Sequence, residues 1–129
     1  MVAIDLQMLL WSVALCLVQI LLSVVLYLPQ VGLPALASNR DGLAPPAGMA
    51  ARAVRAYNNM LENLVLFAAL VLLAAITGRA NDLTALGAML FFWARLAYAV
   101  VYVIGVPWLR TGIWAVSVVG LVIIFLQLL

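Results

Sequence analysis

The chain has 129 residues, of which 70% are hydrophobic and only 8% are charged. Soluble globular domains are about half apolar, so this composition excludes a soluble domain and indicates an integral membrane protein. Six arginines against four acidic residues give a net charge of +2, which provides no basic patch for nucleic-acid binding. One cysteine and no histidine leave no disulfide framework and no zinc-type metal site.

The length allows about four membrane-spanning helices of about 20 residues each. We expect the first span at residues 6–28, interrupted only by neutral polar residues such as Gln19. The small residues at 35–38 resemble a signal-peptide cleavage site, but no basic residue precedes the apolar run and the run is too long for a signal peptide. We therefore expect a retained helix, with Cys16 as a small apolar filler within it.

One long loop and three further spans complete a single four-span membrane domain. Residues 29–46 are rich in residues that break helices, including Pro29, Pro34 and the pair Pro45-Pro46, and form the predicted loop. The remaining spans are predicted at 47–76, 83–105 and 108–129. The expected fold class is therefore all-α, an integral membrane four-helix bundle.

The second span carries polar and charged side chains within an otherwise apolar run. Their spacing of three, four and three residues places them on one face of an α-helix: Arg52, Arg55, Asn59 and Glu62. An ionised side chain near the centre of a membrane helix costs roughly 2.5–3.5 kcal/mol, so such residues persist where they have a partner, water or a ligand. This stripe is therefore a candidate functional site.

The third span carries a second polar stripe at helical spacing, and an arginine opens the fourth span: Arg95, Tyr98, Tyr102 and then Arg110. Spans two and three run antiparallel and a helix rises about 1.5 Å per residue, so their side chains can be matched by depth. Three pairs share a level: Glu62 with Arg95, Asn59 with Tyr98, and Arg55 with Tyr102.

The matched levels predict a polar cleft between the second and third spans. A Glu62–Arg95 ion pair at its floor would offset the cost of holding both charges in the membrane. Arg52 and Arg110 would lie at the rim. A purely structural interpretation also stands, in which Arg52 and Arg55 extend to the lipid headgroups and the ion pair only joins two helices.

The arginines gather at one end of the predicted bundle, in the long loop and at the starts of the second and fourth spans: Arg40, Arg52, Arg55 and Arg110. The opposite end holds Arg79 with the acidic residues Asp5 and Asp82. The positive-inside rule then places the arginine-rich end in the cytoplasm and both termini on the other side.

Glu62 also fits a function of another class. A carboxylate within a four-span membrane protein is typical of small proton-coupled multidrug transporters, where it serves as the proton and cation site. Arg55 and Arg95 lie near the same depth and would repel a cationic drug.

Two segments carry a family resemblance over essentially the whole chain. The run RAVRAYNNMLENLVLF resembles the Arg-x-x-x-Asn-x-x-Glu signature of the membrane-associated proteins in eicosanoid and glutathione metabolism, the MAPEG family. The later run ARLAYAVVYVIGVPWLRTGIW resembles the family's third-helix pattern of arginine and two tyrosines, followed by an arginine that opens the fourth helix. The two motifs occur in the expected spans and order.

This resemblance implies a homotrimer that binds glutathione between neighbouring subunits near the cytoplasmic surface. The matched glutathione contacts would be Arg55, Asn59, Glu62, Tyr98 and Tyr102. Arg95 would correspond to the family's third-helix arginine, and Arg52 would join Arg55 in binding the glutathione carboxylates. Arg110 would be the catalytic residue, because its charge favours the thiolate.

The implied activity is a glutathione-dependent transferase or peroxidase that acts on lipophilic electrophiles or hydroperoxides reaching it from the membrane lipid, a detoxification role. Glutathione would serve as a co-substrate, without a metal. The family also contains a member that binds and presents lipid without catalysis, so a noncatalytic lipid-binding role remains an alternative.

Overall fold

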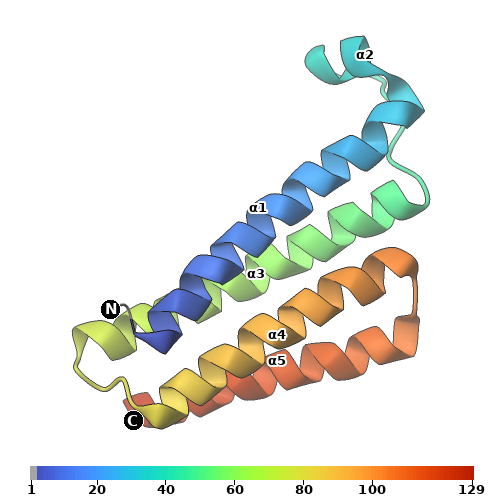
Figure 1. Cartoon of the computed structure of the whole chain (residues 1–129). Coiled ribbons are helices and arrows are strands. Elements are labelled where there is room, and N and C mark those ends of the chain that lie inside the picture. The colour runs from blue at the N-terminus through green and yellow to red at the C-terminus, as the bar shows by residue number, and fades with distance from the viewer. Residues whose placement is uncertain (1–2) are drawn as a thin grey trace.

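The computed structural model describes residues 3–129, which form helices and no strand (Figure 1). Four of the helices are long and apolar enough to cross a membrane: α1 (Ile4–Val31), α3 (Met49–Ile76), α4 (Asp82–Ile104) and α5 (Pro107–Leu128). A short helix, α2 (Leu33–Ala37), lies in the loop between α1 and α3. The expected all-helical, four-span fold is confirmed.

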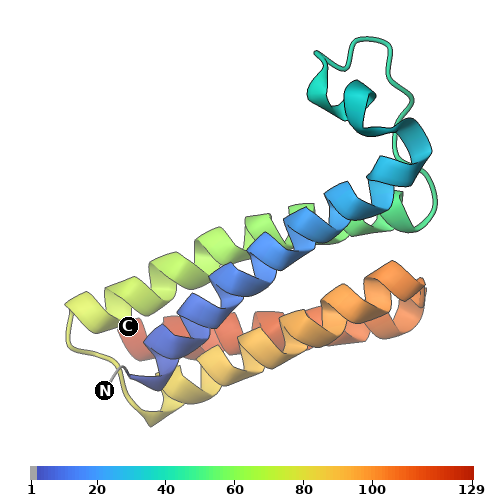
Figure 2. The same cartoon turned by 45° about the horizontal axis from the view of Figure 1, so that its top comes forward.

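The four long helices run alternately up and down, so the connections divide between the two ends of the bundle (Figure 1). One end, which we call the terminal end, carries both chain ends and the α3–α4 turn. The other, which we call the arginine-rich end, carries the long loop and the α4–α5 turn. Figure 2 shows that α2 and its loop stand out beyond the four long helices at the arginine-rich end.

The structure departs from the expected boundaries most at the end of α1. We expected Pro29 to end this helix, but the helix continues through Pro29 to Val31 and ends at Gly32, whose N–H donates to the Leu28 carbonyl at 2.8 Å. A proline lacks only its own N–H, so Pro29 costs the helix one backbone hydrogen bond and does not have to end it, whereas Gly32 at φ 83° takes a conformation that side chains disfavour. The loop also holds the unexpected helix α2.

Local signals fix the two tight connections. Asn81 caps α4, since its Oδ1 accepts from the N–H groups of Leu83 and Thr84, and Thr84 Oγ1 accepts from the Asn81 N–H at 2.8 Å. Gly105 ends α4 in the left-handed conformation, and Pro107 begins α5, where its missing N–H costs nothing. These caps set where α4 starts and stops, and therefore the depth of its tyrosines.

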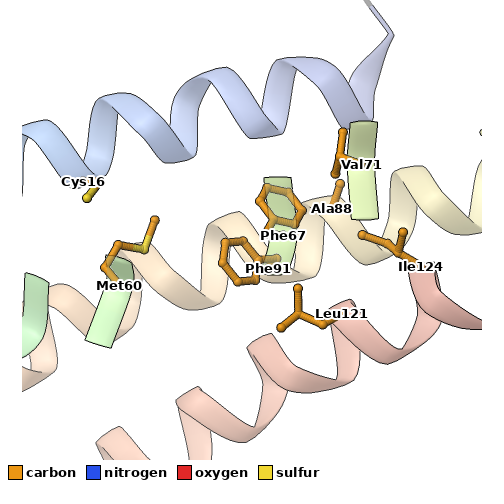
Figure 3. Packing of buried hydrophobic residues seen from close by; sticks show 8 residues of the cluster. All are labelled: Cys16, Met60, Phe67, Val71, Ala88, Phe91, Leu121 and Ile124. Carbon is orange, nitrogen blue, oxygen red and sulfur yellow. The ribbon is translucent and has the colours of Figure 1, made fainter. Parts of the chain in front are cut away.

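The core lies toward the terminal end and joins all four long helices (Figure 3). Its central contact is a stack of Phe67 of α3 on Phe91 of α4, with ring centroids 4.0 Å apart. Burying aromatic rings against each other stabilises the α3–α4 pair. The buried residues of α5 begin at the middle of the helix and continue toward its C-terminus: Ser117, Gly120, Leu121 and Ile124. The N-terminal turns of α5, which carry Arg110, therefore pack less closely.

The first helix turns its polar side chains inward. Its buried residues are Asp5, Ser12, Cys16, Gln19 and Ser23, while its exposed residues are mostly aliphatic. This inverts the pattern of a soluble helix and suits a helix that faces lipid on one side. Cys16 lies in the core cluster, as expected of a small filler.

Candidate functional site

The signature residues of α3 form a stripe beside its buried face. The buried face follows Ala56, Met60 and Asn63, and the signature positions each stand one residue earlier in the chain: Arg55, Asn59 and Glu62. One residue is a rotation of about 100° around a helix, so the stripe lies at the edge of the α3–α4 contact and not within it. Arg55 and Glu62 are exposed and Asn59 is half-buried.

Tyr102 of α4 contacts site residues from both α3 and α5. Its hydroxyl accepts a hydrogen bond from Arg55 Nε at 3.2 Å, which confirms that these two residues share a level. The Arg110 guanidinium stacks over the Tyr102 ring, 4.3 Å from its centroid. An arginine over an aromatic face is attracted by the ring's negative face, so Tyr102 holds cations from α3 and from α5.

A second tyrosine extends the cluster toward the membrane interior. Tyr98 meets Tyr102 edge to face, with centroids 5.5 Å apart and planes at 67°. Arg95, one turn deeper on α4, lies 4.2 Å from the Tyr98 ring centroid. Arginines and tyrosines therefore form one connected cluster along α4, with Arg110 at its outer end and Arg95 at its inner end.

A small open pocket of about 150 Å³ adjoins this cluster. It is lined by residues of three helices: Asn59, Tyr98, Arg110, Thr111 and Trp114. Asn59 and Tyr98 meet at this pocket, as the depth matching predicted. The pocket offers an arginine, a phenol, an amide and a hydroxyl, which are the groups that bind carboxylates and other anions.

Three lining or supporting residues were absent from the sequence-based site. Thr111 and Trp114 carry no charge, and a tryptophan in a membrane helix is typical of packing or of the membrane interface, although Trp114 lies four residues after Arg110 and so on the same helix face. Asn63 donates from Nδ2 to the Asn59 carbonyl at 2.8 Å and to Asn59 Oδ1 at 3.2 Å. The i to i+4 spacing of these two asparagines was the available signal.

The predicted Glu62–Arg95 ion pair is wrong for the single chain. Arg95 is only 1% exposed and its three guanidinium nitrogens have no hydrogen-bond partner within residues 3–129, while Glu62 is exposed. Equal depth fixes the height of two residues but not their direction around the helix axes. Glu62 faces out from the edge of α3, and Arg95 faces the interior of the bundle.

Arg52 is turned away from the pocket. Its Nε donates to the Val103 carbonyl at 2.9 Å, and its guanidinium lies against Gly105 at the end of α4. A cation at the C-terminus of a helix is favoured by the helix dipole and satisfies a carbonyl that has no partner in the helix. Within one chain, Arg52 therefore joins α3 to α4.

These features define a class of protein: a four-span membrane protein with an arginine–tyrosine cluster beside an open polar pocket. The sequence profile of the MAPEG family matches residues 8–129, essentially the whole chain. The chain belongs to this family and is an integral, multi-pass membrane protein. No curated protein and no solved structure matches the chain.

Proposed function

We propose that this protein is a glutathione-dependent membrane enzyme that conjugates or reduces lipophilic electrophiles or hydroperoxides. The observation that carries the proposal is the placement of Arg110 at an open polar pocket, stacked on a tyrosine that is hydrogen-bonded to Arg55. Membership of the MAPEG family fits a role in glutathione metabolism.

The pocket suits one end of glutathione. Glutathione carries two carboxylates, one ammonium and a thiol. Arg55 and Arg110 supply positive charge for the anionic groups, and the exposed carboxylate of Glu62 is available for the ammonium. Arg95 adds a buried positive charge close to Tyr98, which favours an anionic ligand at this position.

The pocket of one chain is too small for the whole tripeptide. Its volume of about 150 Å³ is below the roughly 300–1,000 Å³ typical of small-molecule sites. A neighbouring subunit, in a homotrimer, would supply the remaining wall and give the exposed residues Arg55 and Glu62 a second set of contacts. The trimer is thus part of the proposal, because the site is incomplete without it.

The proposed reaction depends on the positive charge of Arg110 beside the glutathione thiol. The positive charge of Arg110 lowers the pKa of the glutathione thiol, so that more of it is the nucleophilic thiolate. In conjugation, the thiol proton leaves to water and the sulfur attacks the electrophilic carbon. A carbon–sulfur bond forms as the leaving group departs with its electron pair. The electrophile arrives from the bilayer.

The transporter alternative depends on Glu62 as a carboxylate enclosed between helices. Glu62 is exposed on the single chain. Three arginines lie in the same half of the bundle: Arg95 at its level, and Arg55 and Arg110 nearer the arginine-rich end, beside Tyr102. This charge distribution disfavours a cationic substrate.

The proposal is tested with the purified full-length protein and glutathione. We expect glutathione to raise the melting temperature and to support conjugation of chlorodinitrobenzene. Arg110→Ala should lower kcat about tenfold to a hundredfold and reduce the ultraviolet absorbance of the bound thiolate, because the nearest fixed charge is lost.

Arg79→Ala serves as the matched control. Arg79 lies at the terminal end, where Nη1 donates to the Leu128 carbonyl, so its loss should leave kcat unchanged. Wild-type protein that shows neither a thermal shift nor turnover would contradict the proposed activity. Unchanged thiolate absorbance in Arg110→Ala would contradict the role given to that residue.

A further inference from the structure

A second pocket lies at the arginine-rich end, between the long loop, α1 and α3 (Figure 2). Its volume is about 340 Å³, and its lining comes from the C-terminal turns of α1, the N-terminal turns of α3 and the loop that joins them. It shares no lining residue with the pocket beside Arg110. We call it the loop pocket.

The loop pocket combines a single charge with mostly apolar walls. Among residues 3–129, Arg40 is the one charged side chain in its lining. The hydroxyls of Ser23 and Tyr27 also line it, but each already donates to a backbone carbonyl. A cation in a lining without a carboxylate favours an anionic group at this place. The apolar walls favour a ligand that also carries hydrocarbon: Val24, Leu43, Pro46 and Val54.

Contacts with the loop hold Arg40 in place. Its Nε donates to the Leu36 carbonyl at 2.9 Å, and its backbone N–H donates to Ser38 Oγ at 3.1 Å. The Leu43 N–H donates to the Arg40 carbonyl at 3.2 Å, which closes the following turn. The two Nη groups of Arg40 have no hydrogen-bond or ion-pair partner within residues 3–129. The N–H groups of a fixed guanidinium match two oxygens of one phosphate.

The loop pocket lies at the depth where lipid headgroups meet hydrocarbon. Helix α1 has 28 residues, so it is about 42 Å long and exceeds the roughly 30 Å hydrocarbon layer. Its end at the loop therefore reaches the headgroup layer, and the pocket extends about 6 Å from Tyr27 to Ser23, toward the membrane interior. Val24 at the edge of the pocket is 45% exposed and adjoins the aliphatic outer face of α1, so hydrocarbon can enter from the bilayer.

We propose that the loop pocket binds an anionic phospholipid. The Nη groups of Arg40 bind its phosphate, and the first part of one acyl chain lies against Val24 and Val54, while the rest of the lipid stays in the bilayer. Asp41, the one acidic residue of the loop, lies outside the lining, so the ammonium group of a zwitterionic lipid would have no partner there. The pocket therefore selects lipids of net negative charge. No bond in the lipid is made or broken.

The test compares two lipids with the same acyl chains, phosphatidylglycerol and phosphatidylcholine, on the full-length protein in detergent. Native mass spectrometry measures the lipid that the protein retains. Wild-type protein should retain phosphatidylglycerol about threefold to tenfold more strongly, which is the range for one charged hydrogen-bonding group near the surface. Arg40→Gln should lose this preference. Arg79→Gln, which changes an exposed arginine at the terminal end, is the matched control and should keep it.

A second pair of variants tests the apolar part of the loop pocket. Val24→Trp places a large side chain at its edge and should lower retention of phosphatidylglycerol about threefold to tenfold, because the acyl chain loses its place. Val25→Trp is the matched control, since Val25 is 62% exposed and does not line the pocket. Neither position is buried, and melting temperatures report whether each variant is folded.

The proposal is overturned if wild-type protein retains both lipids equally, if the preference survives in Arg40→Gln, or if a folded Val24→Trp retains phosphatidylglycerol fully. Displacement of the lipid by an equal concentration of glycerol 3-phosphate would remove the role of the apolar walls. Stronger retention of palmitate would show a fatty-acid site instead. Displacement by glutathione would assign Arg40 to the glutathione site. The glutathione test gives its result independently of these outcomes, because that test monitors Arg110.

Discussion

Tyr102 has two separable functions in the cluster. Its hydroxyl accepts from Arg55 of α3, and its ring face supports Arg110 of α5. The first contact orders a residue proposed to bind a carboxylate, and the second orders the residue proposed to favour the thiolate. Changing the hydroxyl and the ring separately therefore distinguishes binding from activation.

Tyr102→Phe removes the hydrogen bond and keeps the ring. We expect glutathione affinity to fall about fivefold, since a hydrogen bond of this kind contributes about 1 kcal/mol, while the absorbance of the bound thiolate is retained. Tyr102→Leu removes the ring as well and should lower both. Tyr57→Phe, on α3 beside the loop, is the control for losing a hydroxyl. Loss of thiolate in Tyr102→Phe would refute the division of roles.

For single residues, the sequence predicts which side chains lie at the same height in two helices, but not whether those side chains face each other. The residue count along the two helices correctly predicts the pairs Arg55 with Tyr102 and Asn59 with Tyr98, because the height of a residue depends only on helical rise. It failed for Glu62 and Arg95, because direction around the axis depends on how the helices are rotated against each other. That rotation is set by packing across the whole bundle.

The pairing of α4 with α5 depends on two glycines that face each other. A Cβ atom added to Gly87 would lie 2.6 Å from the Gly120 carbonyl oxygen, and one added to Gly120 would lie 2.5 Å from the Gly87 oxygen. Such distances are too short for real side chains, so the two backbones approach more closely than any other residue allows.

Gly87→Ala should lower the free energy of unfolding by about 1–3 kcal/mol, because the helices must separate to admit the methyl group. Gly112→Ala is the matched control: it is also helical, but its Cβ meets nothing within 4 Å, so it should be neutral or stabilising by up to about 1 kcal/mol. Denaturant titration in detergent compares them. Equal stability of both variants would contradict a tight α4–α5 contact.

Hydropathy and helix caps predict the four long helices, and the two departures, at Pro29 and at α2, each have a local cause. The sequence predicts the four long helices to within a few residues, because apolar runs and the turn signals at Asn81 and Gly105 are strong. Pro29 does not end α1, because a single proline removes one backbone hydrogen bond and the helix ends only at Gly32, which has a positive φ. The short α2 was missed because a five-residue helix in a proline-rich loop has no periodic pattern.

For the whole molecule, the distribution of arginine predicts that the long loop faces the cytoplasm. In right-side-out vesicles, an impermeant maleimide should label Ala80→Cys, in the α3–α4 turn, but should label Asp41→Cys only after permeabilisation. Both positions are exposed and the native Cys16 is buried, so background labelling should be low. Immediate labelling of Asp41→Cys alone would reverse the orientation.

The uneven packing along the bundle means that its two ends tolerate motion differently. The buried residues of α5 begin at Ser117, whereas Arg110 lies about 21 Å along the helix from Ile124. A tilt of about 5° that pivots at Ile124 would carry Arg110 through about 2 Å with little disturbance of the phenylalanine stack. Helix α5 can therefore tilt about its C-terminal half. This motion would widen the pocket beside Arg110 for a bulky molecule while the terminal end of the bundle stays packed.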